Sequence, residues 1–244
     1  MQAIWDGASE TYTDNTYSDI ADSIVKDLRA DGTFCKDVSV MDIGCGPGTY
    51  AFRISPHVRK MVCIDGSQRM IDRLMREAAE RNISNIETLV CDCRLLPGDL
   101  VCDVVFTSLC PPMNYPEMIL EMEKHADRKC AYVSSSNVGT SIELEIWDEL
   151  GCDYSYTGYN TNYPNDFLRS LGRKTQLRFY EQGYEETISV EKCIDRFLGK
   201  FSKYRTVTEK ERDAITKVVR SHDEDGLVHI SSKNRFGLLT WMPE

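Results

Sequence analysis

Residues Val40 to Tyr50 read VMDIGCGPGTY, and this stretch decides the fold. The apolar residues before Gly44 form the short run that is typical of a buried strand, and glycines then occupy positions 44, 46 and 48. Because a side chain at these positions would fill the space of a closely approaching ligand, the glycines predict a binding turn. The stretch therefore indicates a strand that leads into a ligand-binding loop and a helix.

The spacing within this loop distinguishes between two kinds of ligand. A dinucleotide-binding fingerprint needs a third glycine three positions after the second, and this chain has Thr49 there. Asp42 stands just before the loop, and its carboxylate would repel a pyrophosphate but attract an ammonium or sulfonium group. We therefore expect a ligand that carries a positive charge.

Apolar runs alternate with helical patterns from the strand before the loop to residue 136. Ser67 is the expected N-cap of a helix that carries Met70, Ile71 and Leu74. Such alternation predicts a parallel sheet with helices on both faces. The expected strands are residues 38–43, 60–65, 86–92, 103–108 and 130–136.

An acidic residue stands at or near the end of each of the first three strands: Asp42, Asp65 and Asp92. The carboxyl ends of parallel strands meet at the edge where open α/β sheets bind ligands. Asp65 can accept hydrogen bonds from both hydroxyls of a ribose, a feature that nicotinamide enzymes share. Asp92 can accept one from an adenine amino group. The acids therefore favour a nucleoside-containing ligand at this edge.

The segments MDIGCGPGT, CIDGSQRM, VCDC and DVVFTS stand in the order in which one large family carries its motifs. From about Asp37 to Ser136 the chain resembles the class I S-adenosylmethionine-dependent methyltransferases. The resemblance implies an α/β fold with a Rossmann-like, doubly wound, seven-stranded sheet whose last strand is antiparallel. The closing RFGLLTWM fits that strand, and a helical, tyrosine-rich insertion follows the fifth strand. The implied cofactor is S-adenosylmethionine, and its product is S-adenosylhomocysteine.

The resemblance also implies where the cofactor lies. The three glycines border its methionine portion, Asp65 takes the ribose, Asp92 and Cys93 lie at the adenine, and Ser108 lies beside the transferable methyl group. The N-terminal WDGASETY resembles the segment that covers the cofactor in this family, with Tyr12 as the expected contact. The expected cofactor-binding residues are Tyr12, Asp42, Gly44, Cys45, Gly46, Gly48, Asp65, Gly66, Ser67, Met70, Asp92, Cys93 and Ser108.

The methyl acceptor is poorly encoded, because transfer from a sulfonium depends mainly on alignment and requires a general base only for some acceptors. No catalytic residue is named for this reason. SLCPPMN partly resembles the Asn-Pro-Pro-aromatic motif of enzymes that methylate amide or base nitrogens, but Cys110 and Met113 replace its Asn and its aromatic residue. These two replacements therefore disfavour planar nitrogen atoms as methyl acceptors. The expected substrate-side residues are Cys110, Tyr156 and Tyr159, with simple packing as the alternative for each.

The expected organisation is a single methyltransferase domain over residues 1–244. A hairpin is expected around Lys233 and Asn234, and two strand pieces are expected on either side of Gly183. The expected parts are an N-terminal lid and helix (1–36), a cofactor-binding core (37–136), a substrate-side insertion (137–205) and a C-terminal helix and hairpin (206–244).

Composition narrows the function classes. A net charge of −10 disfavours nucleic acid as a partner, since phosphate binding depends on clustered Lys and Arg. The N-terminus lacks the pattern of a signal peptide and no long apolar run follows, so we expect a cytoplasmic protein without membrane contact. The ten cysteines lack a paired CxxC motif, so we expect reduced, packed thiols and no metal site. The oligomeric state stays open.

Three functions are kept. The leading one is methyl transfer from S-adenosylmethionine to a small-molecule acceptor, with the O, N, S or C atom unresolved. The first alternative is a non-catalytic S-adenosylmethionine-binding or regulatory protein with the same fold. The less favoured one is a nicotinamide oxidoreductase.

Overall fold

The computed structural model describes residues 6–7, 9, 18–136, 140–152, 161–202 and 206–244. The chain divides into two compact units. Strands β6 (Thr175–Ser189) and β7 (Leu227–Trp241) contribute residues to both. The first unit comprises Met1–Ser136, Tyr159–Tyr180 and Phe236–Glu244, and the second comprises Asn137–Gly158 and Glu181–Arg235.

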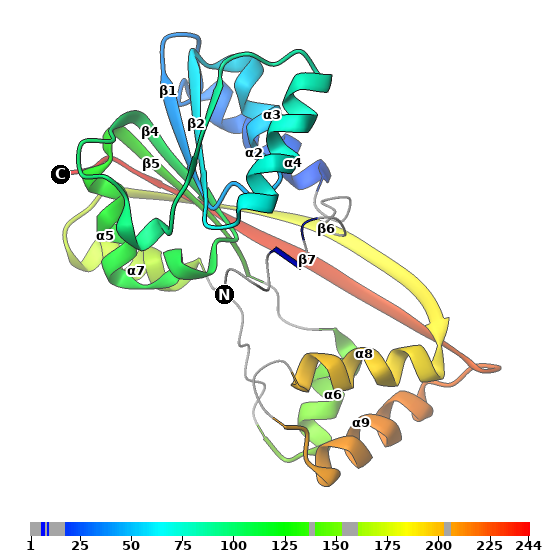
Figure 1. Cartoon of the computed structure of the whole chain (residues 1–244). Helices are drawn as coiled ribbons and strands as arrows, with labels where there is room; N and C mark the ends of the chain where they lie inside the picture. Colours follow the sequence, from blue (N-terminus) through cyan, green and yellow to red (C-terminus); the bar gives the residue numbers. More distant parts are fainter. Residues whose placement is uncertain (1–5, 8, 10–17, 137–139, 153–160, 203–205) are drawn as a thin grey trace. The chain divides into compact units, whose positions relative to one another are not determined.

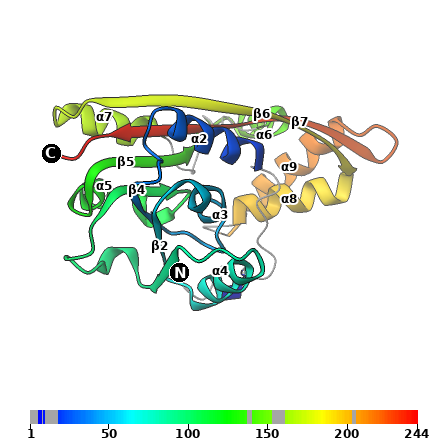
Figure 2. The same cartoon turned by 90° about the horizontal axis from the view of Figure 1, so that it is seen from above.

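Within the described residues, one seven-stranded sheet has the order β3-β2-β1-β4-β5-β7-β6 (Figure 1). Its strands from β3 to β5 pair in parallel, whereas β7 pairs with β5 in the antiparallel direction and lies between β5 and β6 (Figure 2). The expected seven-stranded sheet with an antiparallel last strand is confirmed. The first five strands are β1 (Ser39–Ile43), β2 (Lys60–Asp65), β3 (Ile86–Val90), β4 (Cys102–Ser108) and β5 (Ala126–Ser135).

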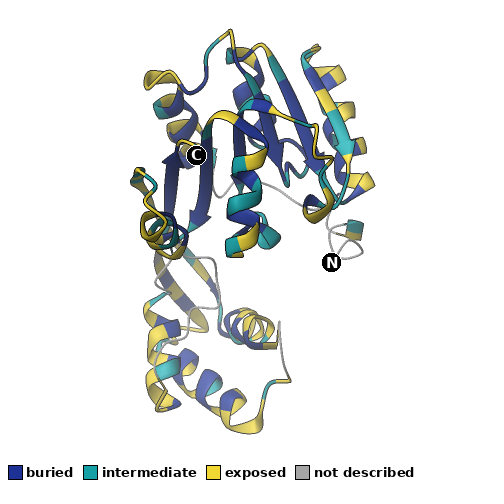
Figure 3. Cartoon of the chain, turned by 90° about the vertical axis from the view of Figure 1, so that its left-hand side faces the viewer, coloured by how far each residue is buried: buried dark blue, intermediate teal, exposed yellow. Residues whose placement is uncertain are grey.

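Helices cover both faces of the sheet in the first unit. Successive side chains of a strand point to opposite faces, so Val40 packs in one hydrophobic cluster with Leu74, whereas Met41 packs in the other with Ile119. Figure 3 shows the central strands as buried along most of their length. The first face carries α2 (Ser18–Ala30), α3 (Ala51–Ile54) and α4 (Gln68–Glu80), and the second carries α5 (Pro116–Lys124) and α7 (Asn162–Ser170) (Figure 1).

The strand order reverses at β1, which pairs with β2 on one side and with β4 on the other. The chain leaves β1 and β4 toward opposite sides of the sheet, and a crevice opens between them at the carboxyl ends of the strands. The loop that begins at Gly44 lies at this switch point. The topology therefore places the glycine loop where open α/β sheets bind their ligands.

The second unit has its own hydrophobic cluster, formed by three helices and by residues of β6 and β7. The rings of Trp147 and Phe201 stack in it with centroids 5.2 Å apart. Thr208 and Glu211 form a capping box, because Thr208 Oγ1 accepts from the Glu211 amide and the Thr208 amide donates to Glu211 Oε2. The helices are α6 (Ser141–Glu149), α8 (Val190–Ser202) and α9 (Glu209–Ser221).

The expected C-terminal hairpin is wrong. Residues Leu227–Trp241 form one continuous strand, and neither Lys233 nor Asn234 has the positive φ that a tight hairpin turn requires. The tight turn lies earlier, where Asp225 (φ 53°) and Gly226 (φ 82°) connect Glu224 to Leu227 through two backbone hydrogen bonds. An Asp-Gly pair is the stronger turn signal, and it stands directly before the strand.

The expected break at Gly183 is also absent. Thr175–Ser189 is a single strand, and a Cβ at Gly183 would meet no atom within 4 Å. An isolated glycine in a strand at the edge of a sheet weakens the strand without ending it.

Among the described residues, no helix is long and apolar enough to cross a bilayer.

A glycine in β7 gives a test of the fold. Gly237 pairs with Ser134, and a Cβ added there would lie 2.7 Å from the Cβ of Thr161, which is fully buried. We expect Gly237→Ala to lower the free energy of unfolding by about 1–3 kcal/mol, because the buried side chain has no room to move. Urea denaturation measures the change. Gly183→Ala is the control with open space, and an equal loss in both variants would contradict the packing account.

Candidate functional site

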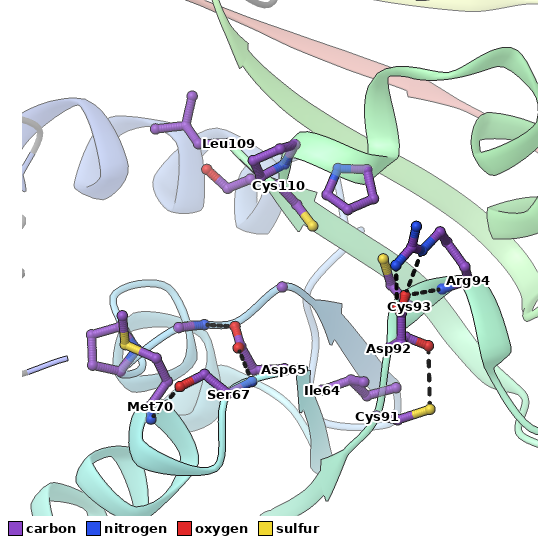
Figure 4. Close-up of a pocket in the computed structure, with 17 residues that line it drawn as sticks. Ile64, Asp65, Ser67, Met70, Cys91, Asp92, Cys93, Arg94, Leu109 and Cys110 are labelled. Atoms are coloured by element: carbon purple, nitrogen blue, oxygen red, sulfur yellow. Dashed lines mark hydrogen bonds and ion pairs between the residues drawn. The ribbon is translucent and has the colours of Figure 1, made fainter. Parts of the chain in front are cut away.

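A cavity of about 400 Å³ lies at the carboxyl ends of the strands in the first unit (Figure 4). This volume is within the range of small-molecule sites. Ten of the residues predicted from the sequence line it: Gly44, Gly46, Asp65, Gly66, Ser67, Met70, Asp92, Cys93, Ser108 and Cys110. Sequence reasoning missed Pro47, Ile64, Cys91, Arg94, Leu109, Pro111 and Pro112.

Asp65, the last residue of β2, holds two loops of the cavity together. Its Oδ2 accepts a hydrogen bond from the Gly46 amide (2.9 Å), and its Oδ1 accepts one from the Ser67 amide (2.8 Å). Burial raises the pKa of Asp65, and the two backbone hydrogen bonds oppose that rise. A carboxylate has about four acceptor positions, so Asp65 retains capacity to accept hydroxyl groups from a ligand.

The glycine loop is fixed to β2 by its backbone. The amides of Gly44 and Cys45 both donate to the Ile64 carbonyl, at 2.8 and 3.0 Å. A Cβ at Gly44 (φ 74°) would lie 2.5 Å from the sulfur of Cys110, and a Cβ at Gly48 (φ 101°) would lie 2.8 Å from the ring of Phe52. These two glycines therefore make room for the protein's own side chains, and only Gly46 borders the cavity without such a neighbour.

Asp42 lies beneath the loop, outside the larger cavity. Its side chain is buried, and together with Cys45 and Gly46 it lines a smaller cavity of about 50 Å³. Burial raises its pKa to about 8, and the neighbouring charge of Asp65 adds to the effect. The carboxyl group of Asp42 is thus held in an environment that a nearby cation would stabilise.

Asp92 occupies the expected place after β3, but its carboxylate is already bound. The amide, Nε and Nη2 of Arg94 all donate to it, and the pKa of Asp92 falls to about 2 chiefly because of these hydrogen bonds from Arg94. The exposed Arg94 was missed by sequence reasoning, although an arginine two residues after an acid was visible. A ligand at Asp92 therefore meets an ion pair.

The loop after β4 forms the wall opposite Asp65. Leu109 has a left-handed backbone (φ 49°), which turns the chain between Ser108 and Cys110. Asn114 then donates from Nδ2 to the Pro111 carbonyl (2.6 Å), and the Tyr132 hydroxyl donates to its Oδ1. Sequence reasoning missed this bracing, because it joins the loop to a residue of β5.

The described part of the N-terminal segment contacts α4. The Ser67 hydroxyl donates to Asp6 Oδ1, and Arg73 Nη1 donates to the Ser9 carbonyl (2.7 Å). Ser67 is also the N-cap of α4, where its hydroxyl accepts from the Met70 amide, as expected. Asp6 thus lies beside Ser67 at the edge of the cavity. The predicted Tyr12, Tyr156 and Tyr159 lie outside the described residues.

Comparisons with known proteins agree with this geometry. Residues 40–128 match the family model described as "Methyltransferase domain", whereas no curated protein matches the sequence. The YcgJ protein from Bacillus subtilis is 16% identical with a TM-score of 0.59, and the alignment covers 91% of this chain and 99% of that one.

Two enzymes with named acceptors have the same fold. Magnesium protoporphyrin IX methyltransferase from Synechocystis, solved with S-adenosylhomocysteine, is 15% identical with a TM-score of 0.56, over 93% of this chain and 83% of that one. Geranyl diphosphate C-methyltransferase from Streptomyces coelicolor is 12% identical with a TM-score of 0.51, over 91% and 78%. The chain therefore has the fold of these S-adenosylmethionine-dependent methyltransferases, and its residues 40–128 are similar to the methyltransferase domain that the family model describes.

The raised pKa of Asp42 predicts a dependence of stability on pH. The carboxyl is protonated in the folded protein below about pH 8, whereas in the unfolded chain it ionises near its ordinary pKa of 3.8. The folded state therefore binds more protons between these values, and its stability falls as the pH rises from about 4 to about 8. In the wild-type protein we expect the free energy of unfolding to decline by an amount on the order of a few kcal/mol across that range, and we expect Asp42→Asn to remove this decline. Urea denaturation at several pH values measures the change.

Asp103 provides the control of opposite sign. The Ser39 amide donates to its carboxylate and is the main cause that lowers the pKa of Asp103. Its stabilising effect is present above pH 4 and lost as the pH falls below it. Asp103→Asn should therefore leave the decline between pH 4 and 8 unchanged. A wild-type decline that persists in Asp42→Asn would contradict the assignment.

Proposed function

We propose that the chain binds S-adenosylmethionine in the 400 Å³ cavity and transfers its methyl group to a small-molecule acceptor. The observation that carries the proposal is the set of groups around the cavity. A glycine loop lies at the switch point of the sheet, and Asp65 and Asp92 line the walls that follow the next two strands. These groups fit a nucleoside with a cationic sulfur better than they fit a diphosphate.

The residues of the cavity suggest a role for each part of the cofactor. The amides of the glycine loop border the methionine portion, and the free acceptor positions of Asp65 receive the ribose hydroxyls. Asp92 and Cys93 flank the adenine, and Ser108 lies near the sulfur. Bound S-adenosylmethionine supplies an activated methyl group, so the protein's task is to align the acceptor with it and to exclude water.

The acceptor is proposed only as a class. The related structures act on acceptors as different as magnesium protoporphyrin IX and geranyl diphosphate, according to their names, so the fold leaves the acceptor open. The net charge of −10 favours a small molecule over a polynucleotide. The loop Cys110–Asn114 and the tyrosines 156 and 159 are the proposed acceptor side. A cytoplasmic location stays part of the proposal.

Transfer of label is the direct test of turnover. The protein is incubated with methyl-labelled S-adenosylmethionine and a protein-free metabolite extract, and we expect label in a new small molecule together with S-adenosylhomocysteine. Saturable cofactor binding without labelled product from any extract would favour the non-catalytic alternative. Saturable binding of a nicotinamide dinucleotide without binding of S-adenosylmethionine would favour the oxidoreductase.

The ribose role of Asp65 gives a second prediction. Asp65→Ala removes the hydroxyl acceptor and should weaken S-adenosylhomocysteine binding by about 1–3 kcal/mol, as calorimetry measures it. Asp103→Ala is the matched control, because the Asp103 carboxylate also accepts hydrogen bonds, from the amide and hydroxyl of Ser39 and from Arg59, but at the opposite edge of the sheet. An unchanged dissociation constant in folded Asp65→Ala would refute the role.

A further inference from the structure

Two cysteines from distant parts of the sequence meet in the cavity. Cys93 begins a short 3-10 turn after β3, and Cys110 follows the left-handed Leu109 after β4. Both line the cavity and both are free thiols, and Figure 4 shows their sulfur atoms turned toward each other. Each of the two thiols is the largest cause of the shift in the other's pKa, which indicates that their side chains lie within interaction distance. The two side chains therefore form a contacting thiol pair.

Backbone contacts hold each cysteine in place. The Cys110 carbonyl accepts from the Met113 amide (3.0 Å), and the Cys110 sulfur lies directly over Gly44. On the other side, Asp92 is the N-cap of the turn that begins at Cys93, and its carbonyl accepts from the Leu95 amide (2.8 Å). The pair is thus preorganised by two short turns.

The electrostatics make the two sulfurs unequal. The interaction with Cys110 is the main cause that lowers the pKa of Cys93, and the same interaction raises that of Cys110. A thiolate is the reactive form of cysteine, so Cys93 is the nucleophile of the pair. The pair Cys45 and Cys63 differs, because both residues lie in the hydrophobic core and burial raises the pKa of Cys45.

We propose that Cys93 and Cys110 are an oxidation site that reacts with hydrogen peroxide and closes to a disulfide. In the first step the Cys93 sulfur attacks one peroxide oxygen, the O–O bond breaks, and hydroxide leaves and takes up a proton to form water. Cys93 is then a sulfenic acid. In the second step the Cys110 sulfur attacks the Cys93 sulfur, the S–O bond breaks, and the hydroxyl leaves with the Cys110 proton as a second water. Two thiols are oxidised by two electrons, and the peroxide is reduced.

The disulfide would close the cavity to its ligand. It joins the walls that follow β3 and β4 and fixes the two turns closer together. This consequence rests on the proposed function, whereas the formation of the bond does not. Oxidised protein should bind S-adenosylhomocysteine at least about tenfold more weakly than reduced protein, and dithiothreitol should restore binding.

Peptide mapping of the wild-type chain tests the bond itself. Reduced protein is treated with hydrogen peroxide, remaining thiols are alkylated, and the chain is cut by a protease that cleaves before aspartate. Cleavage at Asp92 separates Cys91 from Cys93, and cleavage at Asp103 separates Cys102 from Cys110. We expect a linked peptide pair that contains Cys93 and Cys110, and slower linkage when S-adenosylhomocysteine is present.

Variants give the controls. Cys152→Ser changes an exposed thiol of the second unit and should leave the linkage unchanged, whereas Cys93→Ser and Cys110→Ser should abolish it. Linkage of other cysteines, or oxidation of Cys93 without linkage, would overturn the proposal. A disulfide-linked protein that binds S-adenosylhomocysteine as tightly as the reduced one would contradict the claim that the disulfide closes the cavity to its ligand. Failure of reduced protein to bind it would instead count against the proposed function, with the mapping unaffected.

Discussion

The carboxylate of Asp65 joins the two loops that build the cavity, and the site depends on this contact. One oxygen holds the Gly46 amide of the glycine loop, and the other holds the Ser67 amide at the start of α4. The Ile64 carbonyl, one residue earlier, holds the amides of Gly44 and Cys45. The end of β2 therefore orients the loop that leaves β1, and the parallel register of the two strands sets the shape of the site.

Burial of acidic side chains at the carboxyl ends of the strands costs free energy, and a bound cation would offset this cost. Burial raises the pKa of both Asp42 and Asp65, the charge of Asp65 raises that of Asp42 further, and the charge of Asp6 raises that of Asp65. The environment of Asp92 differs, because hydrogen bonds from the exposed Arg94 stabilise its ionised carboxylate. The buried carboxyl groups of Asp42 and Asp65 thus lie beneath and beside the glycine loop, where the proposed sulfonium would bind and would favour their ionised forms. A diphosphate at the same place would add negative charge to an already acidic site.

The sequence predicted the features that depend on local pattern. The alternation of strands and helices and the cap at Ser67 follow from neighbouring residues, and both are confirmed. The hairpin at Lys233 was wrong because two apolar runs with a polar pair between them also describe one long strand. The bracing of Asn114 by Tyr132 and the Cys93–Cys110 contact join different strands of the sheet, and no spacing along the chain reports them.

The thiol pair and the carboxylates act on the same property of the cavity, its negative charge. A donor with a sulfonium gains from every anionic group around it, whereas the product S-adenosylhomocysteine has lost that charge, so an acidic cavity favours the donor over the product. The lowered pKa of Cys93 favours the ionised thiol, which would add to this preference, and a Cys93–Cys110 disulfide removes that contribution while leaving Asp42 and Asp65 in place. Oxidation would therefore alter the discrimination between donor and product as well as the space available, since both depend on the same two sulfur atoms.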